Sequence, residues 1–108
     1  MALTFYNTLS RSLEEFKPLS GSEARLYTCG PTVYDFAHIG NFRAYVFEDL
    51  LRRALRFEGY RVIQVMNLTD VDDKTIRGSR AAGKSLRDYT EPFKRAFFED
   101  IDALGIER

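Results

Sequence analysis

Apolar and polar residues alternate along the chain in short strand-like runs, which are followed by longer helical stretches. Residues 3–9 mix apolar and polar side chains in near alternation, and residues 12–17 form a second short extended piece before a proline. This pattern predicts an N-terminal hairpin or a pair of edge strands. Residues 24–29 predict a short buried strand that a Gly-Pro pair terminates.

The most regular helical pattern runs from Phe42 to Phe57. Its apolar residues follow the i, i+3, i+4, i+7, i+8 spacing of one helix face, and charged residues occupy the opposite face. We expect the apolar stripe to face the core and the arginines to form solvated helix surface without a function. The stripe consists of Phe47, Leu50, Leu51, Ala54 and Leu55, and the charged face of Glu48, Asp49, Arg52, Arg53 and Arg56.

A second apolar strand is predicted at residues 61–66, after a helix end at which Gly59 is the expected C-cap. Strand, helix and strand within about forty residues indicate a βαβ unit, whose two strands are parallel and whose crossover is right-handed. Ligands in open parallel sheets bind beyond the carboxyl ends of the strands. The pattern therefore brings Cys29 and the loop that begins at Asn67 to the same edge.

Two further helices are predicted in the C-terminal third. The first runs from Asp72 to Ala82 and ends at Gly83, although Gly78 inside it weakens the pattern. The second follows Ser85, which opens the element, and carries an apolar stripe with Thr90 as the expected cap and Pro92 in the first turn. The stripe consists of Tyr89, Phe93, Ala96, Phe97, Ile101 and Leu104.

Composition limits the broad class of protein. A chain of 108 residues with 44% hydrophobic residues can form a core, so it is one small domain or a piece of a larger one. Sixteen basic and sixteen acidic residues cancel, and the net charge gives no argument for a nucleic-acid surface. One cysteine cannot form an internal disulfide, and no apolar run approaches the roughly 20 residues that span a bilayer. We expect a cytosolic protein that does not enter a membrane.

Residues 27–41 carry the most informative pattern, in which a strand passes through a Gly-Pro turn into His-x-Gly-Asn and a long helix. The N-terminus of a helix presents unpaired N–H groups and the positive end of its dipole, which favour a phosphate. Gly40 would let the phosphate approach closely. His38 and Asn41 would lie near each other and could both donate hydrogen bonds to phosphate oxygens.

Cys29 has three readings from the residues alone. It is a small buried hydrophobe at a strand end, a nucleophile, or a zinc thiolate. Zinc needs about four ligands, and the chain contains a single cysteine and a single histidine. The chain alone is therefore not expected to complete a zinc site.

An acidic cluster follows the second predicted strand. Asp70, Asp72 and Asp73 place three carboxylates within four residues, which could hold magnesium or orient ribose hydroxyls or substrate amino groups. The alternative is that Asp72 and Asp73 cap the next helix. Thr69 and Asp70 lie closer to the strand end and are the better candidates for a binding site.

Taken in order, three segments closely resemble the N-terminal part of the catalytic domain of cysteinyl-tRNA synthetases. They are residues 27–35, residues 38–41 and residues 67–74, and the likeness covers nearly the whole chain. The resemblance implies an α/β fold with a Rossmann-type (HUP-like) parallel sheet and helices packed on it, of which residues 1–108 would be the N-terminal half. It also implies activation of cysteine with ATP to cysteinyl-adenylate, followed by transfer to tRNA(Cys).

The resemblance also implies roles for individual residues. Cys29 matches the family's first Zn²⁺ ligand, where the metal binds the substrate thiolate and so favours cysteine over serine. His38 and Asn41 match the catalytic signature, in which charge on the phosphates of Mg²⁺-bound ATP is stabilised. The implied ATP-binding residues are Pro31, Thr32, His38, Gly40 and Asn41. The implied substrate-binding residues are Gly30, Thr32, Thr69 and Asp70.

Two departures from the family pattern bear on these expectations. Asn41 stands where the signature has its last histidine, which keeps a hydrogen-bond donor but loses a potential positive charge. The chain also stops before the second half of the sheet, the remaining zinc ligands, the KMSKS loop and the anticodon-binding region, so it has the appearance of a fragment of a protein that is monomeric at full length.

Three other functions fit parts of the pattern. The first is the related ligase that joins cysteine to an amino-sugar in mycothiol synthesis, which shares the adenylation chemistry but needs no tRNA. The second is a nucleotide-binding remnant that keeps the fold and has lost the reaction. A plain nucleotidylyltransferase ranks last, because it gives no reason for Cys29.

Overall fold

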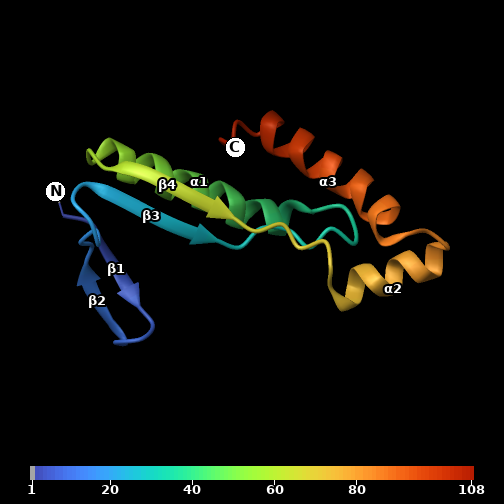
Figure 1. The fold of residues 1–108 in the computed structure, drawn as a ribbon. Helices are drawn as coiled ribbons and strands as arrows, with labels where there is room; N and C mark the ends of the chain where they lie inside the picture. The colour runs from blue at the N-terminus through green and yellow to red at the C-terminus, as the bar shows by residue number, and fades with distance from the viewer. Residues whose placement is uncertain (1) are drawn as a thin grey trace.

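The computed structural model describes residues 2–108, and its elements follow the order of the predicted ones (Figure 1). Within residues 2–108, four strands form two separate two-stranded sheets, and three helices accompany them. The elements are β1 (Thr4–Asn7), β2 (Ser12–Glu15), β3 (Glu23–Thr28), α1 (Ile39–Phe57), β4 (Arg61–Met66), α2 (Asp73–Ala82) and α3 (Leu86–Ala103). No helix within the described residues is long and apolar enough to cross a membrane.

The predicted N-terminal hairpin is confirmed. Strands β1 and β2 are antiparallel, with Thr4 opposite Glu15 and Asn7 opposite Ser12. The ring of Phe16, just after β2, packs edge-on against Tyr60 with 5.3 Å between ring centroids. This contact attaches the hairpin to the βαβ unit at the start of β4.

Strands β3 and β4 are parallel and α1 connects them, as the βαβ prediction requires. Their register pairs Ala24 with Val62 and Thr28 with Met66. The α/β assignment is therefore confirmed, whereas the described part of the chain contains a parallel sheet of only two strands. A larger Rossmann-type sheet stays a prediction.

The expectation that residues 24–29 form a buried strand is correct for one face of the sheet only. Ala24 is fully buried, but Tyr27 is 72% exposed. Ile63 and Val65 on β4 are also exposed. Side chains alternate between the two faces of a strand, and these exposed residues share one face. Within residues 2–108 no element covers that face.

Helix α1 begins three residues earlier than predicted, at Ile39 instead of Phe42. His38 is its N-cap, so Gly40 and Asn41 belong to the first turn. The helix ends at Phe57 as predicted, but its C-cap is Glu58 and not Gly59, which follows the cap with φ +95°. The hydrophobic periodicity located the body of the helix but not its polar first turn.

The predicted core face of α1 is partly wrong. Leu55 is buried, but Phe47 and Leu50 are more than 60% exposed, and the other buried residue of the helix is Tyr45. The largest cluster of buried apolar residues joins α1 to α3, and Phe42, Met66 and Leu68 pack against it. Its members are Tyr45, Phe97, Ile101 and Ile106.

The two C-terminal helices follow the predicted order, with one correction. Helix α2 is capped by Asp72 and ends at Gly83, as expected. Helix α3 begins at Leu86 with Ser85 as its cap, so Thr90 is a buried interior residue and Pro92 lies beyond the first turn. Proline has no N–H, and α3 therefore lacks the hydrogen bond that residue 92 would donate to Asp88.

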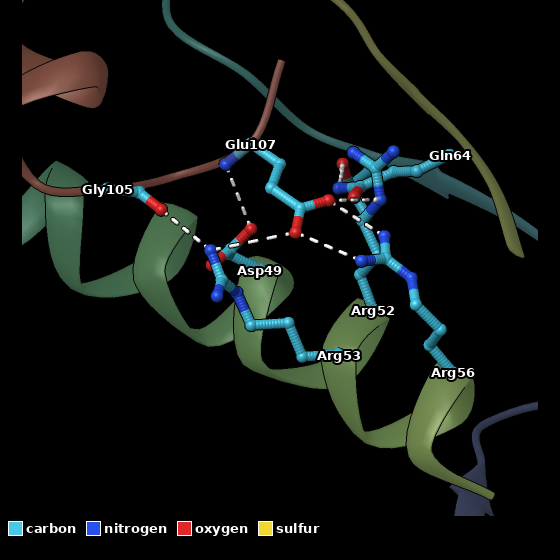
Figure 2. A network of polar contacts seen from close by, with 8 residues as sticks. Asp49, Arg52, Arg53, Arg56, Gln64, Gly105 and Glu107 are labelled. Atoms are coloured by element: carbon cyan, nitrogen blue, oxygen red, sulfur yellow. Dashed lines mark hydrogen bonds and ion pairs between the residues drawn. The ribbon is translucent and has the colours of Figure 1, made fainter.

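The arginine face of α1, predicted to be solvated, instead binds the C-terminal residues (Figure 2). Arg56 donates two hydrogen bonds to the Glu107 carboxylate, at 3.0 and 2.7 Å. Nε of Arg52 lies 3.6 Å from the same carboxylate. Arg53 donates to the Gly105 carbonyl at 2.7 Å, and the Glu107 N–H donates to Asp49 at 3.1 Å. We call this set of contacts the C-terminal clamp.

The clamp joins residues about fifty positions apart in the sequence. Hydrogen bonds from Arg56, together with the charges of Arg52 and Arg53, lower the pKa of Glu107 from 4.5 to about 2. The ionised carboxylate is therefore more stable in the folded chain than in the unfolded one. The sequence prediction missed these contacts because an arginine stripe shows no sign of a carboxylate that lies far away in the chain.

We expect Glu107→Gln to lower the thermal midpoint of unfolding at neutral pH. Because the folded-state pKa is depressed, the contribution of Glu107 is fully present above pH 4.5 and disappears as the pH falls toward about 2. The midpoints of wild type and variant, followed by circular dichroism, should therefore converge over that range. Asp102→Asn is a matched control, because it breaks an ion pair with Arg108, which lies only six residues away in the sequence. Equal losses in both variants would contradict a special role for the clamp.

Candidate functional site

A cavity of about 270 Å³ lies between the carboxyl end of β3, the following loop and the first turns of α1 and α2. It contains five of the predicted site residues: Gly30, Pro31, Thr32, His38 and Asn41. Its remaining lining comes from Tyr34, Asp35, Phe36, Ala37, Tyr45 and Lys74. The cavity therefore lies where the βαβ pattern predicts a ligand site.

The ends of the two parallel strands are held together beyond the regular sheet. The Gly30 N–H donates to Oδ1 of Asn67 at 2.8 Å, and Thr32 forms a parallel bridge with Thr69. A Cβ atom at Gly30 would overlap the Asn67 carbonyl and lie 2.7 Å from Cγ of Met66. Only glycine allows this close approach.

His38 and Asn41 meet, but they bind each other's backbone. Nδ1 of His38 accepts a hydrogen bond from the Gly40 N–H at 3.0 Å, and Oδ1 of Asn41 accepts one from the His38 N–H at 3.0 Å. This reciprocal arrangement is a capping box. The Gly40 N–H, expected to be free for a phosphate, is thus occupied by the His38 ring.

The capping box determines which donors remain for a ligand. Because Nδ1 of neutral His38 acts as an acceptor, the proton of the ring is on Nε2, which can donate. The amide nitrogen of Asn41 keeps its two N–H donors. The α1 cap therefore fixes one tautomer of His38 beside a second donor, on two residues that line the cavity.

Lys74 supplies a cation that the sequence reasoning did not assign to the site. It lies at the start of α2 and lines the cavity, with its ammonium 4.9 Å from the centre of the Tyr34 ring. No carboxylate of residues 2–108 comes within 4.0 Å of this ammonium. The signal available in the sequence is its position directly after the acidic cluster.

The acidic cluster separates into different roles. Asp72 is the N-cap of α2 and accepts a hydrogen bond from the Lys74 N–H, while the Thr75 hydroxyl oxygen accepts one from the Asp72 N–H. Asp73 belongs to the first turn of the helix. The capping alternative is thus confirmed for Asp72.

Thr69 and Asp70 lie next to the cavity but not in its lining. The Thr69 backbone pairs with Pro31 and Val33 at 2.9 and 3.0 Å. Asp70 forms an ion pair with Lys94 of α3 at 3.0 Å, and this hydrogen bond lowers the pKa of Asp70. Their substrate-binding role stays a prediction.

Cys29 follows β3 directly and is exposed at the sheet edge. Its thiol sulfur lies 3.8 Å from the Gly30 carbonyl. The described residues contain no group of three or more histidine, cysteine, aspartate or glutamate side chains that could hold a metal. Cys29 and the other described side chains therefore do not form a complete zinc site.

Burial changes the pKa of two side chains of α1, Tyr45 in the cavity lining and Glu48. Burial raises the pKa of Tyr45, with smaller contributions from Cys29 and Glu48. Burial also raises the pKa of Glu48, against a hydrogen bond from Thr28 that lowers it. One Glu48 oxygen is buried without a hydrogen-bond partner among residues 2–108. Burial therefore disfavours the ionised forms of these two side chains.

Tyr89 links α3 to the cavity loop across α2. Its hydroxyl donates to the Tyr34 carbonyl at 2.7 Å, and its ring passes over Gly78. A Cβ atom at Gly78 would lie 2.5 Å from Cζ of Tyr89. The glycine that weakened the helix prediction is thus required by a close contact.

Comparison with known proteins identifies the family. Residues 15–108 match the family profile described as tRNA synthetases class I (C) catalytic domain. The chain belongs to this family.

Several curated relatives carry the name Cysteine--tRNA ligase. The relative from Protochlamydia amoebophila is 61% identical over 105 residues, which are 97% of this chain and 22% of that protein. The relative from Brachyspira hyodysenteriae is 60% identical over 106 residues, 98% of this chain and 22% of that protein. The relative from Solibacter usitatus is 58% identical over 108 residues, all of this chain and 23% of that protein. The chain thus spans less than a quarter of the length of these relatives.

We expect Gly78→Ala to destabilise the fold by about 1–3 kcal/mol, because the added methyl group displaces Tyr89. In a Tyr89→Ala background the same substitution should be neutral or stabilising, since alanine favours a helix over glycine by about 1 kcal/mol. Urea denaturation of the four proteins measures this difference. Equal destabilisation in both backgrounds would contradict the proposed contact.

Proposed function

We propose that residues 1–108 form the nucleotide-binding first part of an ATP-dependent cysteine–tRNA ligase. The observation that carries the proposal is the capping box of His38 and Asn41 at the cavity edge, in a chain of the class I (C) synthetase family. The activity and its substrates belong to the complete protein, because the relatives are more than four times as long as this chain.

The proposed reaction joins cysteine to the α-phosphate of ATP. A carboxylate oxygen of cysteine attacks the α-phosphorus, the bond to the bridging oxygen breaks, and pyrophosphate leaves with its electron pair. The transferred cysteinyl group then passes from the adenylate to a hydroxyl of tRNA(Cys), and AMP is released. Negative charge shifts among the phosphate oxygens during the first step, so donors in fixed positions lower its barrier.

The donors proposed for this task are the Nε2–H of His38 and the amide of Asn41. The Lys74 ammonium adds a positive charge at the same cavity. Asn41 cannot carry the charge that a histidine there could acquire, and Lys74 compensates for that loss. We further propose that Pro31, Thr32 and Gly40 shape the ATP site.

The amino-acid part of the site is proposed on the resemblance and on proximity. Gly30 and Thr32 line the cavity, and Thr69 pairs with Thr32 beside it. Asp70 would have to release Lys94 to bind the amino group of cysteine. Cys29 keeps its predicted role as one Zn²⁺ ligand, for which the other ligands would come from outside these residues.

We also propose that these residues are the N-terminal half of a larger catalytic domain. The uncovered face of the β3–β4 sheet supports this view, because it exposes the apolar side chains of Tyr27, Ile63 and Val65. The unpaired outer edges of the sheet would accept additional parallel strands.

Among the alternatives, the mycothiol-type ligase is not favoured, because the relatives described above are all named as tRNA ligases. A nucleotide-binding remnant differs from the main proposal only in lacking turnover. ATP affinity and cysteine-dependent exchange, measured separately, distinguish these two.

The test uses three proteins: wild type, His38→Asn and His38→Ala. Asparagine preserves an N-cap acceptor and removes the Nε2 donor, whereas alanine removes both. We expect both variants to lose ATP affinity. Only His38→Ala should also lose stability, by about 0.5–2 kcal/mol. Titration calorimetry with Mg²⁺-ATP and thermal unfolding measure the two effects.

A second assay tests the reaction itself. It measures cysteine-dependent ATP–pyrophosphate exchange with zinc present and with serine as the competing amino acid. We expect removal of the His38 donor to lower the exchange rate by about 10²–10³-fold in any form that turns over. Unchanged ATP affinity in His38→Asn, or a folded wild-type chain that binds no ATP, would contradict the proposed site.

A further inference from the structure

The segment from residue 74 to residue 87 carries five basic residues and no acidic residue, although the whole chain has zero net charge. The basic residues are Lys74, Arg77, Arg80, Lys84 and Arg87. Lys74 belongs to the cavity described above. The other four lie on α2, in the turn after it and in the first turn of α3, and all four are exposed. We call these four residues the α2 basic surface.

The geometry of α2 places its arginines on the side that faces away from the protein. Thr75 and Ser79 are the buried residues of this helix. At 100° per residue, Arg77 lies about 160° around the helix from both buried residues, and Arg80 lies about 140° from Thr75 and about 100° from Ser79. The two arginines are neighbours of each other at an i, i+3 spacing. Both guanidinium groups are therefore presented to solvent from one face.

The cations of the α2 basic surface have no carboxylate partner within 4.0 Å among residues 2–108. The nearest acidic positions in sequence are Asp73, Asp88 and Glu91, and none of them forms an ion pair with the surface. Arg52, Arg53 and Arg56 of α1 differ, because Glu107 and Asp49 bind them in the C-terminal clamp (Figure 2). Carboxylates of the same chain thus neutralise these three arginines, and none within residues 2–108 neutralises the α2 basic surface.

We propose that the α2 basic surface binds the phosphate backbone of RNA. The inference rests on the proposed function and extends it by assigning a surface to the RNA substrate. Unpaired, exposed arginines and lysines bind a phosphate backbone by releasing its condensed counterions. Arginine also fits phosphate oxygens with two parallel hydrogen bonds.

The position of α2 supports RNA over other polyanions. The helix begins at the cavity with Lys74 and extends away from it over about 15 Å. An RNA whose reacting end entered the cavity would lay its backbone along this helix. Figure 1 shows α2 at the end of the molecule opposite the N-terminal hairpin.

An anionic membrane is the less favoured partner. Helices that bind membranes carry large apolar side chains opposite their basic face and insert them among the lipids. On α2 the side opposite the arginines is buried against the protein and carries Thr75 and Ser79. The α2 basic surface therefore carries positive charge but no large apolar side chain that could insert into a bilayer.

The test compares wild type with the double variant Arg77→Glu/Arg80→Glu in binding to a fluorescent tRNA(Cys) transcript. We expect the variant to lose affinity by about tenfold or more at 0.1 M salt, and its salt slope to fall by about 2, since each phosphate contact contributes close to one released counterion. Arg77→Lys/Arg80→Lys should retain the slope. Arg11→Glu/Lys17→Glu is the matched control, with the same charge change on the hairpin.

Mg²⁺-ATP affinity, measured on the same proteins, separates this proposal from the proposed function. Unchanged ATP affinity together with weaker RNA binding supports the α2 basic surface. Equal RNA binding by wild type and the α2 variant, or an equal loss in the hairpin control, overturns it while leaving the ATP site intact. Binding to phosphatidylserine vesicles that is stronger than binding to the transcript would also overturn it.

Discussion

The close approach of the two strand ends is the constraint on which the rest of the structure depends. The parallel pairing of β3 with β4 continues through the Gly30–Asn67 hydrogen bond and the Thr32–Thr69 bridge. This continuation fixes where the chain turns into α1 and so where the His38 cap lies. A side chain at Gly30 would overlap the Asn67 carbonyl and separate the strand ends beside the cavity.

Two sets of long-range contacts hold the helices around these two strand ends. The C-terminal clamp binds residues after α3 to the arginine face of α1, while Tyr89 binds α3 to the cavity loop. The buried cluster around Tyr45 and Phe97 lies between these attachments. Both ends of α3 are thereby tied to the βαβ unit, although no strand follows α3 within these residues.

The sequence predicts best those features that depend on neighbours along the chain. The hairpin, the parallel pair, the extent of β4 and the α2 cap all follow from periodicity and capping residues. The arginine face of α1 could not be assigned correctly, because its partner Glu107 lies fifty-one residues away from Arg56. The exposed Phe47 and Leu50 illustrate the same limit, since an apolar stripe does not reveal which of its members the protein covers. For the cavity, the motif predicted five lining residues but not Lys74.

His38 combines two tasks in a single imidazole ring. One nitrogen completes the start of α1, and the other is the donor available to a ligand. A substitution at position 38 must therefore meet two requirements. It must cap the helix, and it must supply the donor that we propose for ligand binding. Asparagine and serine meet the first requirement as N-cap residues, but neither has a ring nitrogen that extends as far as Nε2 of histidine. The capping geometry at the start of α1 thus restricts which residues can occupy position 38.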